Sequence, residues 1–179
     1  DMITKKLNNK QKEQVMKKWS QFERIASSDQ RLSFIAYDIN KHFVDNYKTE
    51  GSQFKAMLAT NSKVEAIRYL KYFEEAGDLN AAVVISPPDQ REGYEAVDEK
   101  TQDMVKRFWD KMMARYGNEE NYEESIKDEF VNGDNLDLLI VVEKLLTGFD
   151  AHRATIMYID RPMKEHTLLQ AIARVNRLH

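Results

Sequence analysis

Apolar residues follow two different patterns along this chain, and from residue 54 onward the two patterns alternate. Short runs that are apolar at most positions fall at residues 54–60, 81–86, 136–142 and 155–160. The segments at about 62–76 and from about 165 onward instead repeat apolar residues at helical spacing. Strands that are apolar at consecutive positions are buried on both faces, as in a parallel sheet. Because strands that alternate with helices indicate βαβ units, we expect four parallel strands in an α/β domain.

The residues before this region predict two helices. A charged amphipathic helix is expected at about residues 9–27, where Val15, Trp19 and Phe22 recur at helical spacing. A second helix is expected to begin behind Asp29, a good N-cap, and to run toward Tyr47. We therefore expect an N-terminal helical extension.

The long polar stretch at residues 87–133 also contains two helical patterns, at about 98–115 and 119–131. We interpret this pair of helices as a cover for the sheet, with a partner-binding insertion as the alternative. The predicted organisation is a helical extension at 1–52 and a three-layer domain at 53–179. The domain has a mostly parallel sheet, and the polar stretch is its helical insert.

The last predicted helix carries a cationic stripe. At about 100° per residue, one narrow side of this helix holds His166, Gln170, Arg174 and Arg177. The opposite side is apolar and is expected to pack on a core, through Leu168, Leu169, Ile172 and Val175. Arginine suits an anion site because its flat, permanently charged group binds phosphate oxygens through two parallel hydrogen bonds. The alternative is an ordinary solvated face, although this stripe has no Glu or Lys to mix its charge.

Ligands of open parallel sheets bind outside the carboxyl ends of the strands, where this sequence places Asp160 at the end of the fourth predicted strand. The segment Thr60-Asn61-Ser62 follows the first predicted strand and opens a helix, whose free N–H groups could hold a phosphate. The alternative for these residues is ordinary N-cap chemistry. After the third predicted strand, Gly148 lets the backbone approach a ligand, and Asp150 could accept hydrogen bonds from ribose hydroxyls. The alternative there is a tight turn in which Asp150 is a cap.

Composition and charge narrow the possible functions. The net charge of −3 and the pI near 5.9 exclude a globally basic surface, so any nucleic-acid binding must come from a local patch. Without cysteine there is neither a disulfide nor a thiolate metal site, and the four scattered histidines give no reason to expect a metal. The longest apolar run, at 138–142, is far too short to cross a bilayer. With no signal peptide apparent, we expect a cytoplasmic protein without a membrane span.

Two further sequence patterns narrow the possible functions. None of the six glycines begins the loop in which P-loop NTPases hold phosphates, so the arginines are expected to reach a phosphate held by another domain. Pro88-Asp89 followed by Asp98-Glu99-Lys100 loosely fits a metal-dependent nuclease pattern. We disfavour that interpretation because Asp98 has the position of a helix cap, whereas the nuclease acid stands on a strand.

These residues resemble a known family. Over about forty residues, 138–178, the sequence is similar to the second RecA-like motor domain of the restriction (R) subunit of type I restriction-modification enzymes, which belong to helicase superfamily 2. In that family Thr147-Gly148-Phe149-Asp150 corresponds to motif V, and the segment from Gln170 to Arg177 corresponds to motif VI. The segment 54–60 corresponds to motif IV, with a looser match. The resemblance implies a RecA-like three-layer fold.

The resemblance also implies a nucleotide site shared between two domains. Arg174 and Arg177 would be arginine fingers that reach the γ-phosphate of ATP, with ATP and Mg²⁺ held mainly by the preceding motor domain. Gly148, Asp150 and Gln170 would line the nucleotide cleft from this side. The parent protein would be a type I site-specific deoxyribonuclease and ATP-dependent translocase. The present chain would be a fragment of it, and inactive as an ATPase on its own.

The resemblance further implies contacts with double-stranded DNA. Thr60, Asn61 and Thr147 would contact its phosphate backbone, which a translocating motor binds without regard to sequence. The expected protein partners are the first RecA-like domain of the same parent chain and the modification and specificity subunits of the restriction complex.

One residue departs from the family pattern, and two other functions remain open. The family commonly has proline after its Thr-Gly-Phe-Asp-Ala segment, where this chain has His152 and therefore lacks a rigid turn residue. A different superfamily 2 helicase or remodeller would also fit the spacing of Gln170, Arg174 and Arg177. The third hypothesis is a non-catalytic α/β interaction domain whose arginines bind an acidic partner.

Overall fold

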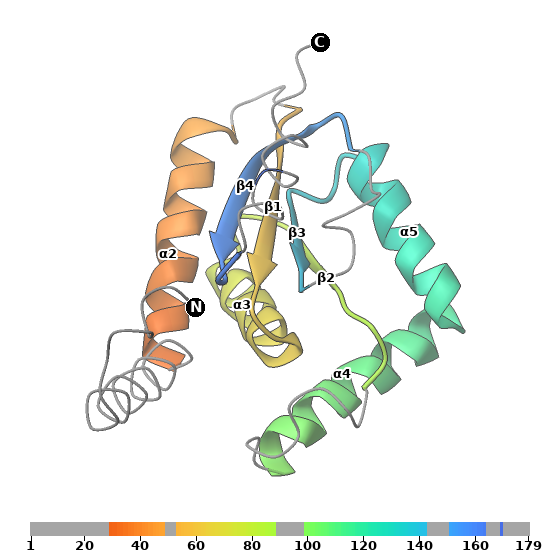
Figure 1. Ribbon diagram of the computed structural model, residues 1–179. Coiled ribbons are helices and arrows are strands. Elements are labelled where there is room, and N and C mark those ends of the chain that lie inside the picture. The colour runs from red at the N-terminus through yellow and green to blue at the C-terminus, as the bar shows by residue number, and fades with distance from the viewer. Residues whose placement is uncertain (1–28, 49–52, 89–98, 143–150, 164–168, 170–179) are drawn as a thin grey trace, which may run out of the picture.

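The computed structural model describes residues 29–48, 53–88, 99–142, 151–163 and 169. Figure 1 shows its helices arranged around a central sheet of four strands. In chain order the elements are α2 (Asp29–Asn46), β1 (Lys55–Thr60), α3 (Lys63–Ala76), β2 (Ala81–Val84), α4 (Glu99–Tyr116), α5 (Glu119–Val131), β3 (Leu138–Val141) and β4 (Ala154–Asp160). The helix predicted at 9–27 lies outside the described residues. No helix within the described ranges is long and apolar enough to cross a membrane.

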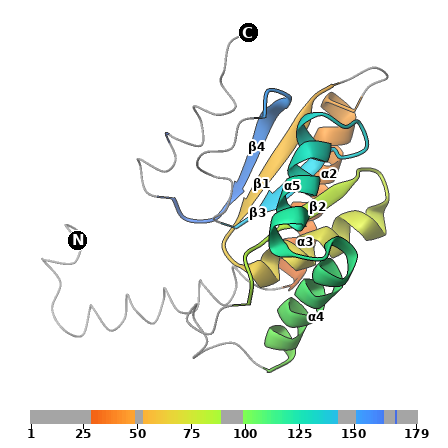
Figure 2. The same cartoon turned by 90° about the vertical axis from the view of Figure 1, so that its right-hand side faces the viewer.

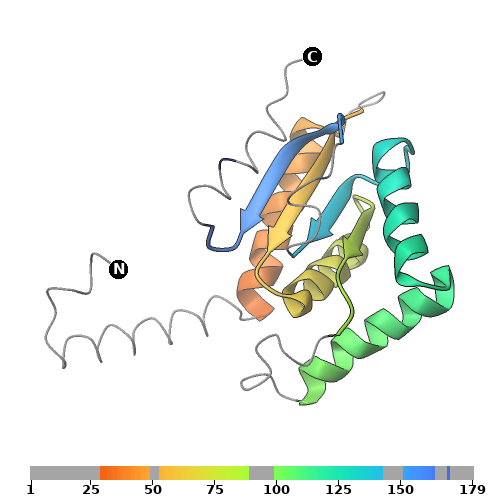
Figure 3. The ribbon, with the colours of Figure 1, turned by 45° about the vertical axis from the view of Figure 1, so that its right-hand side comes forward.

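The four strands form one sheet in which every neighbouring pair is parallel, in the order β2-β3-β1-β4. Figure 3 shows the strands side by side in this order. Every residue of β1 and β3 is buried. For β3, burial on both faces was predicted by its unbroken apolar run. The sequence-based prediction of an α/β, RecA-like domain with four parallel strands is therefore confirmed. The bounds differ from the prediction by at most two residues at either end: β2 ends at Val84 rather than at Ser86, and β3 spans Leu138–Val141 rather than 136–142.

Helices cover both faces of the sheet and give three layers, as Figure 2 shows with α5 on the near side and α2 on the far side. On one face, Ala56 and Leu58 of β1 share a core with buried residues of α2 and α3. On the other face, Met57 and Ala59 share a second core with buried residues of α5, chiefly Tyr122, Ile126 and Phe130. Successive residues of a strand point to opposite faces, so a single strand supplies both cores.

The two cores show where the predicted N-terminal extension and the predicted helical insert lie relative to the sheet. Part of the predicted extension, α2, packs through Leu32, Ala36, Ile39 and Phe43 into the same core as the sheet. The insert contributes α5, so its interpretation as a cover for the sheet is confirmed. The domain boundary at residue 52 stays a prediction.

A buried lysine, Lys55, joins the amino-terminal edge of the sheet to α5. Lys55, the first residue of β1, donates hydrogen bonds from Nζ to the carbonyl oxygens of Gly133 (2.5 Å) and Glu129 (3.1 Å). Arg153 Nη1 also donates to the Gly133 carbonyl, at 2.9 Å. Glu129 lies in the last turn of α5 and Gly133 lies just beyond the C-cap, where the helix dipole favours positive charge. Burial lowers the pKa of Lys55. This contact explains why a strand with buried faces begins with a lysine.

Candidate functional site

The candidate site lies at the carboxyl edge of the sheet, where β1, β3 and β4 end beside the start of α3. Thr60 is the last residue of β1, and its side chain is completely buried. Its hydroxyl Oγ1 lies 3.3 Å from the carbonyl oxygens of both Ser62 and Val141, to which it donates. Thr60 therefore ties the end of β1 to the end of β3. A contact between its side chain and DNA would require the hydroxyl to leave both acceptors, whereas Asn61 beside it is exposed.

The start of α3 shows the cap chemistry that the sequence left open. Ser62 is the N-cap, and its hydroxyl accepts a hydrogen bond from the Glu65 N–H at 3.2 Å. Glu65 Oε2 in return accepts from the Asn61 N–H at 3.1 Å. This arrangement resembles a capping box, in which side chains satisfy the N–H groups at the start of a helix. A phosphate bound here would meet the Glu65 carboxyl, whose pKa is raised chiefly by burial.

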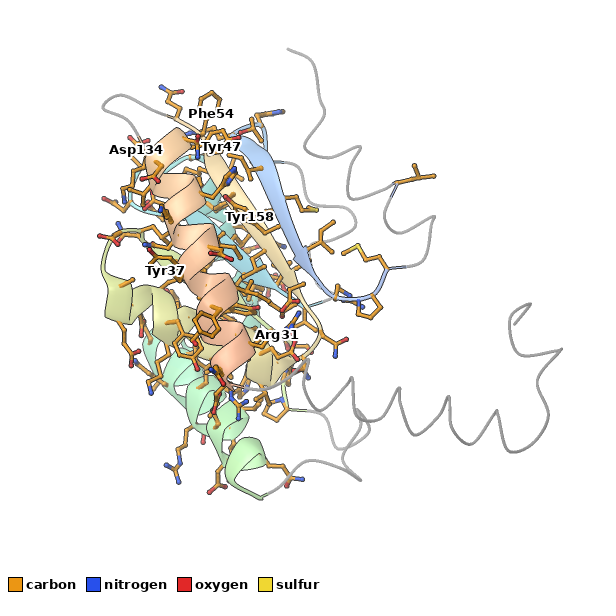
Figure 4. All side chains as sticks on the ribbon, turned by 90° about the vertical axis from the view of Figure 1, so that its left-hand side faces the viewer. Arg31, Tyr37, Tyr47, Phe54, Asp134 and Tyr158 are labelled. Carbon is orange, nitrogen blue, oxygen red and sulfur yellow. The ribbon has the colours of Figure 1, made fainter. Side chains whose placement is uncertain are left out.

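Asp160, the last residue of β4, is held by the two helices on one face of the sheet. Arg31 of α2 donates to it from both terminal nitrogens, with Nη1 2.9 Å from Oδ2 and Nη2 bonded to Oδ1. Tyr69 of α3 donates its hydroxyl to Oδ2 at 2.5 Å. Figure 4 shows Arg31 extending from α2 toward the side on which β4 ends.

Asp160 favours the charged form of Arg31 and the protonated form of Tyr69. The hydrogen bond to Asp160 raises the pKa of Arg31 above its ordinary value. Burial, and then the bond to Asp160, raises the pKa of the Tyr69 hydroxyl, so it remains a donor. A two-pronged bond between a guanidinium group and a carboxylate fixes direction as well as distance. The end of β4 is thus held firmly relative to α2 and α3.

Arg161, which follows Asp160, contacts the end of β3 instead. Arg161 Nη1 donates to the carbonyl oxygen of Val142 at 2.5 Å. Val142 directly follows β3 and directly precedes the segment that contains Thr147 and Asp150. Arg161 therefore joins the chain leaving β4 to the chain leaving β3.

Most of the predicted site residues lie outside the described residues: Thr147, Gly148, Asp150, Gln170, Arg174 and Arg177. Their assignments stay predictions. Asp89 and Asp98, on which the nuclease-like pattern depends, also lie outside. Leu169 is described, and 66% of it is exposed, so its predicted packing on the core is wrong in this structure. Helical spacing shows which residues share a stripe but not what covers the stripe.

Sequence reasoning found Asp160 at the carboxyl edge but missed its partners. Arg31 lies 129 positions away and Tyr69 lies 91 positions away, so no local motif connects them to Asp160. One signal was available. A carboxylate at the end of a half-buried strand needs a donor or a cation, and Arg31 stands near the start of a neighbouring helix. Among the residues that the structure describes, no group of three or more acids and histidines could hold a metal ion.

Comparison with known proteins covers most of the chain. The family model described as type I restriction enzyme subunit R domain 3 matches residues 52–179. A putative type I restriction enzyme MjaVIIP endonuclease subunit from Methanocaldococcus jannaschii is 34% identical over 149 residues, which is 78% of this chain and 13% of that protein. The HindI endonuclease subunit from Haemophilus influenzae is 31% identical over 166 residues, 87% of this chain and 14% of that protein. The chain thus spans about one seventh of the length of these relatives.

Proposed function

The chain belongs to the family of type I restriction enzyme R subunits, and we propose that it is the second motor domain of an ATP-dependent DNA translocase within such an enzyme. The observation that carries this proposal is the family match across 52–179, a range that includes Thr147–Asp150 and Gln170–Arg177. The parallel sheet supports it, because both segments follow strands that end at one edge. The parent protein is proposed to be a restriction endonuclease, as the names of the two relatives describe those proteins.

In this proposal the domain contributes charge to a nucleotide held mainly by the first motor domain of the parent chain. The donor set fits ATP, because the guanidinium groups of Arg174 and Arg177 match phosphate oxygens. Gln170 and Asp150 offer an amide and a carboxylate to the rest of the nucleotide, and Gly148 permits close approach of the backbone. Bound ATP with Mg²⁺ supplies the phosphoryl group that is transferred to water. The arginines stabilise the negative charge that develops during that transfer.

Contacts with the backbone of double-stranded DNA are proposed for the same edge of the sheet. Asn61 is exposed immediately beyond β1 and is the described residue best placed to reach a phosphate. Thr147 is proposed as a second contact. Thr60, whose buried hydroxyl is bonded to the Val141 carbonyl, is proposed to act indirectly by holding Asn61 in position. Such contacts position a motor on DNA without reading its sequence. The modification and specificity subunits are the proposed partners, in the cytoplasm, and the chain alone is expected to lack ATPase activity.

The test is a double substitution, R174A with R177A, in the full-length parent enzyme. We expect DNA-stimulated ATP hydrolysis to fall by ~10³-fold or more, the scale of known arginine fingers, while DNA binding is retained. The matched control is R107A, which removes an arginine whose side chain is 81% exposed on α4. Unchanged ATP hydrolysis in the double variant would contradict the motor assignment. Loss of binding to an acidic protein partner alone would instead support a non-catalytic interaction domain.

A further inference from the structure

Asp160, the last residue of β4, and Arg161, which follows it, bond to two different parts of the fold. Asp160 is bonded to Arg31 and Tyr69 on the face of the sheet covered by α2 and α3. Arg161 is bonded to the carbonyl of Val142 at the end of β3. Pro162 follows, and its ring fixes its own φ and restricts the residue before it. The first residues beyond β4 are therefore constrained by an ion pair, a hydrogen bond and a proline ring.

We call this arrangement the exit clamp (Arg31, Tyr69, Asp160 and Arg161). It precedes the segment of the chain that carries the proposed arginine fingers. The chain that leaves the clamp continues after about ten residues to Gln170, and then to Arg174 and Arg177. The carbonyl that Arg161 holds begins the segment that leads to Thr147. The clamp thus connects the starting points of both segments that carry the proposed nucleotide residues.

We propose that the exit clamp positions the arginine fingers, with Arg31 and Asp160 as its main positioning residues. This inference rests on the proposed motor function. A group that stabilises a transition state must be held close to its working geometry, and a displacement of about 1 Å from a distant substitution can cost ~10²-fold in rate. The Arg31–Asp160 bond provides that control because its two parallel hydrogen bonds allow one orientation. The clamp acts through the arginines and does not touch the nucleotide.

The burial pattern separates this role from general support of the fold. The side chain of Arg31 is 31% exposed, and that of Asp160 is 9% exposed. On α2 the core contacts come from other residues, chiefly Leu32, Ala36 and Phe43, which are nearly inaccessible to solvent. Methionine at position 31 would keep the unbranched stem and the helical preference while it removes the charge. The variant R31M should therefore keep α2 on the sheet while it releases the end of β4.

The experiment measures steady-state ATP hydrolysis by the full-length parent enzyme carrying R31M. We expect kcat to fall about 10- to 100-fold with a smaller change in KM for ATP, because the fingers act mainly on the transition state. R31K restores the charge without the two-pronged geometry and should give an intermediate kcat. The matched control is K71M, which breaks an exposed ion pair between Lys71 and Glu75 on α3 and should leave kcat unchanged. A wild-type kcat in R31M would overturn the proposal.

A double-variant comparison distinguishes failure of this inference from failure of the proposed function. If the clamp acts through the fingers, R31M should cause little further loss of kcat in an enzyme that already carries R174A and R177A. An equal loss in both backgrounds would overturn the clamp and leave the motor function intact. Normal hydrolysis by the R174A and R177A enzyme would instead refute the motor function. Should R31M fail to fold, Y69F tests the same carboxylate by removing one hydrogen bond, with the same expected loss of kcat relative to KM and the same overturning result.

Discussion

The hydroxyl of Tyr122 should contribute measurably to the free energy of unfolding of the domain. Tyr122 lies on α5, is completely inaccessible to solvent, and donates to the carbonyl oxygen of Val83 at 2.5 Å. Val83 belongs to β2, which is an edge strand of the sheet. Edge strands expose backbone groups, and here a helix residue satisfies one of them. The substitution Tyr122→Phe removes this bond and leaves the ring in place.

The magnitude follows from what the substitution leaves behind. A hydrogen bond within a protein contributes about 0.5–1.5 kcal/mol net, and a buried acceptor left without its donor costs about 1–3 kcal/mol. The ring contacts of Tyr122 with Trp109 (5.9 Å between centroids) and Tyr116 (5.6 Å) are retained, so no cavity term is added. We therefore expect Tyr122→Phe to lower the free energy of unfolding by about 1–3 kcal/mol. In a chain of this size, that corresponds to a fall in Tm of about 2–4 °C per kcal/mol.

The assay is urea denaturation followed by circular dichroism, with the free energy extrapolated to water. Tyr37→Phe is the matched control, because Tyr37, labelled on α2 in Figure 4, is 62% exposed. Its substitution should change stability by less than about 0.5 kcal/mol. If Tyr122→Phe left the midpoint unchanged or raised it, the buried bond would be worth no more than the hydrophobic gain of losing a hydroxyl. The Val83 carbonyl left without its donor would then carry no net cost, which contradicts the prediction.

Two further predictions concern stability. Ser62→Ala removes the N-cap of α3, which accepts from the Glu65 N–H at the start of that helix, and should cost about 1 kcal/mol. Ser33→Ala in α2 should cost less, because the Ser33 hydroxyl donates to the Gln30 carbonyl within the helix instead of accepting from an N–H at its start. Equal costs in urea denaturation would contradict the cap assignment. Stability should also fall at alkaline pH, because burial raises the pKa of Tyr158 to about 12 and raises those of Tyr69 and Tyr122 further. The unfolded chain ionises these groups near pH 10 while the folded chain keeps its protons, so their contribution is intact below that pH and is lost as the pH rises toward 12 and above. A free energy of unfolding that stays flat between about pH 9 and 11 would contradict this prediction, and Tyr158→Phe should reduce the slope.

Much of the fold could be predicted because its signals are local. The unbroken apolar run before Val142 predicted a buried strand, and β3 is one. The cap at Ser62 was recognisable because N-cap chemistry involves residues only three positions apart. The helix predicted at 119–131 has those bounds in the structure, since its apolar residues recur at helical spacing. Strand parallelism followed from strands alternating with helices.

The candidate site was only partly predictable, because its contacts join distant parts of the chain. The sequence placed Asp160 at the carboxyl edge but offered no means of finding Arg31 in another layer. It left Thr60 open between a phosphate contact and a structural role. The structure shows the hydroxyl of Thr60 bonded to the carbonyl of Val141, 81 positions away. Leu169 shows the same difficulty, because its burial depends on what lies opposite.

By itself, the sequence determined the type of each described element and the layer architecture, because hydrophobic periodicity reports on the local geometry of helices and strands. It also determined the family, since the motif residues lie close together along the chain. The strand order β2-β3-β1-β4, the seat of Lys55 against the end of α5, and the bonds of the exit clamp were decided only by the tertiary structure. The physical reason is that burial and ion pairing depend on distances between elements, and one-dimensional spacing does not encode those distances.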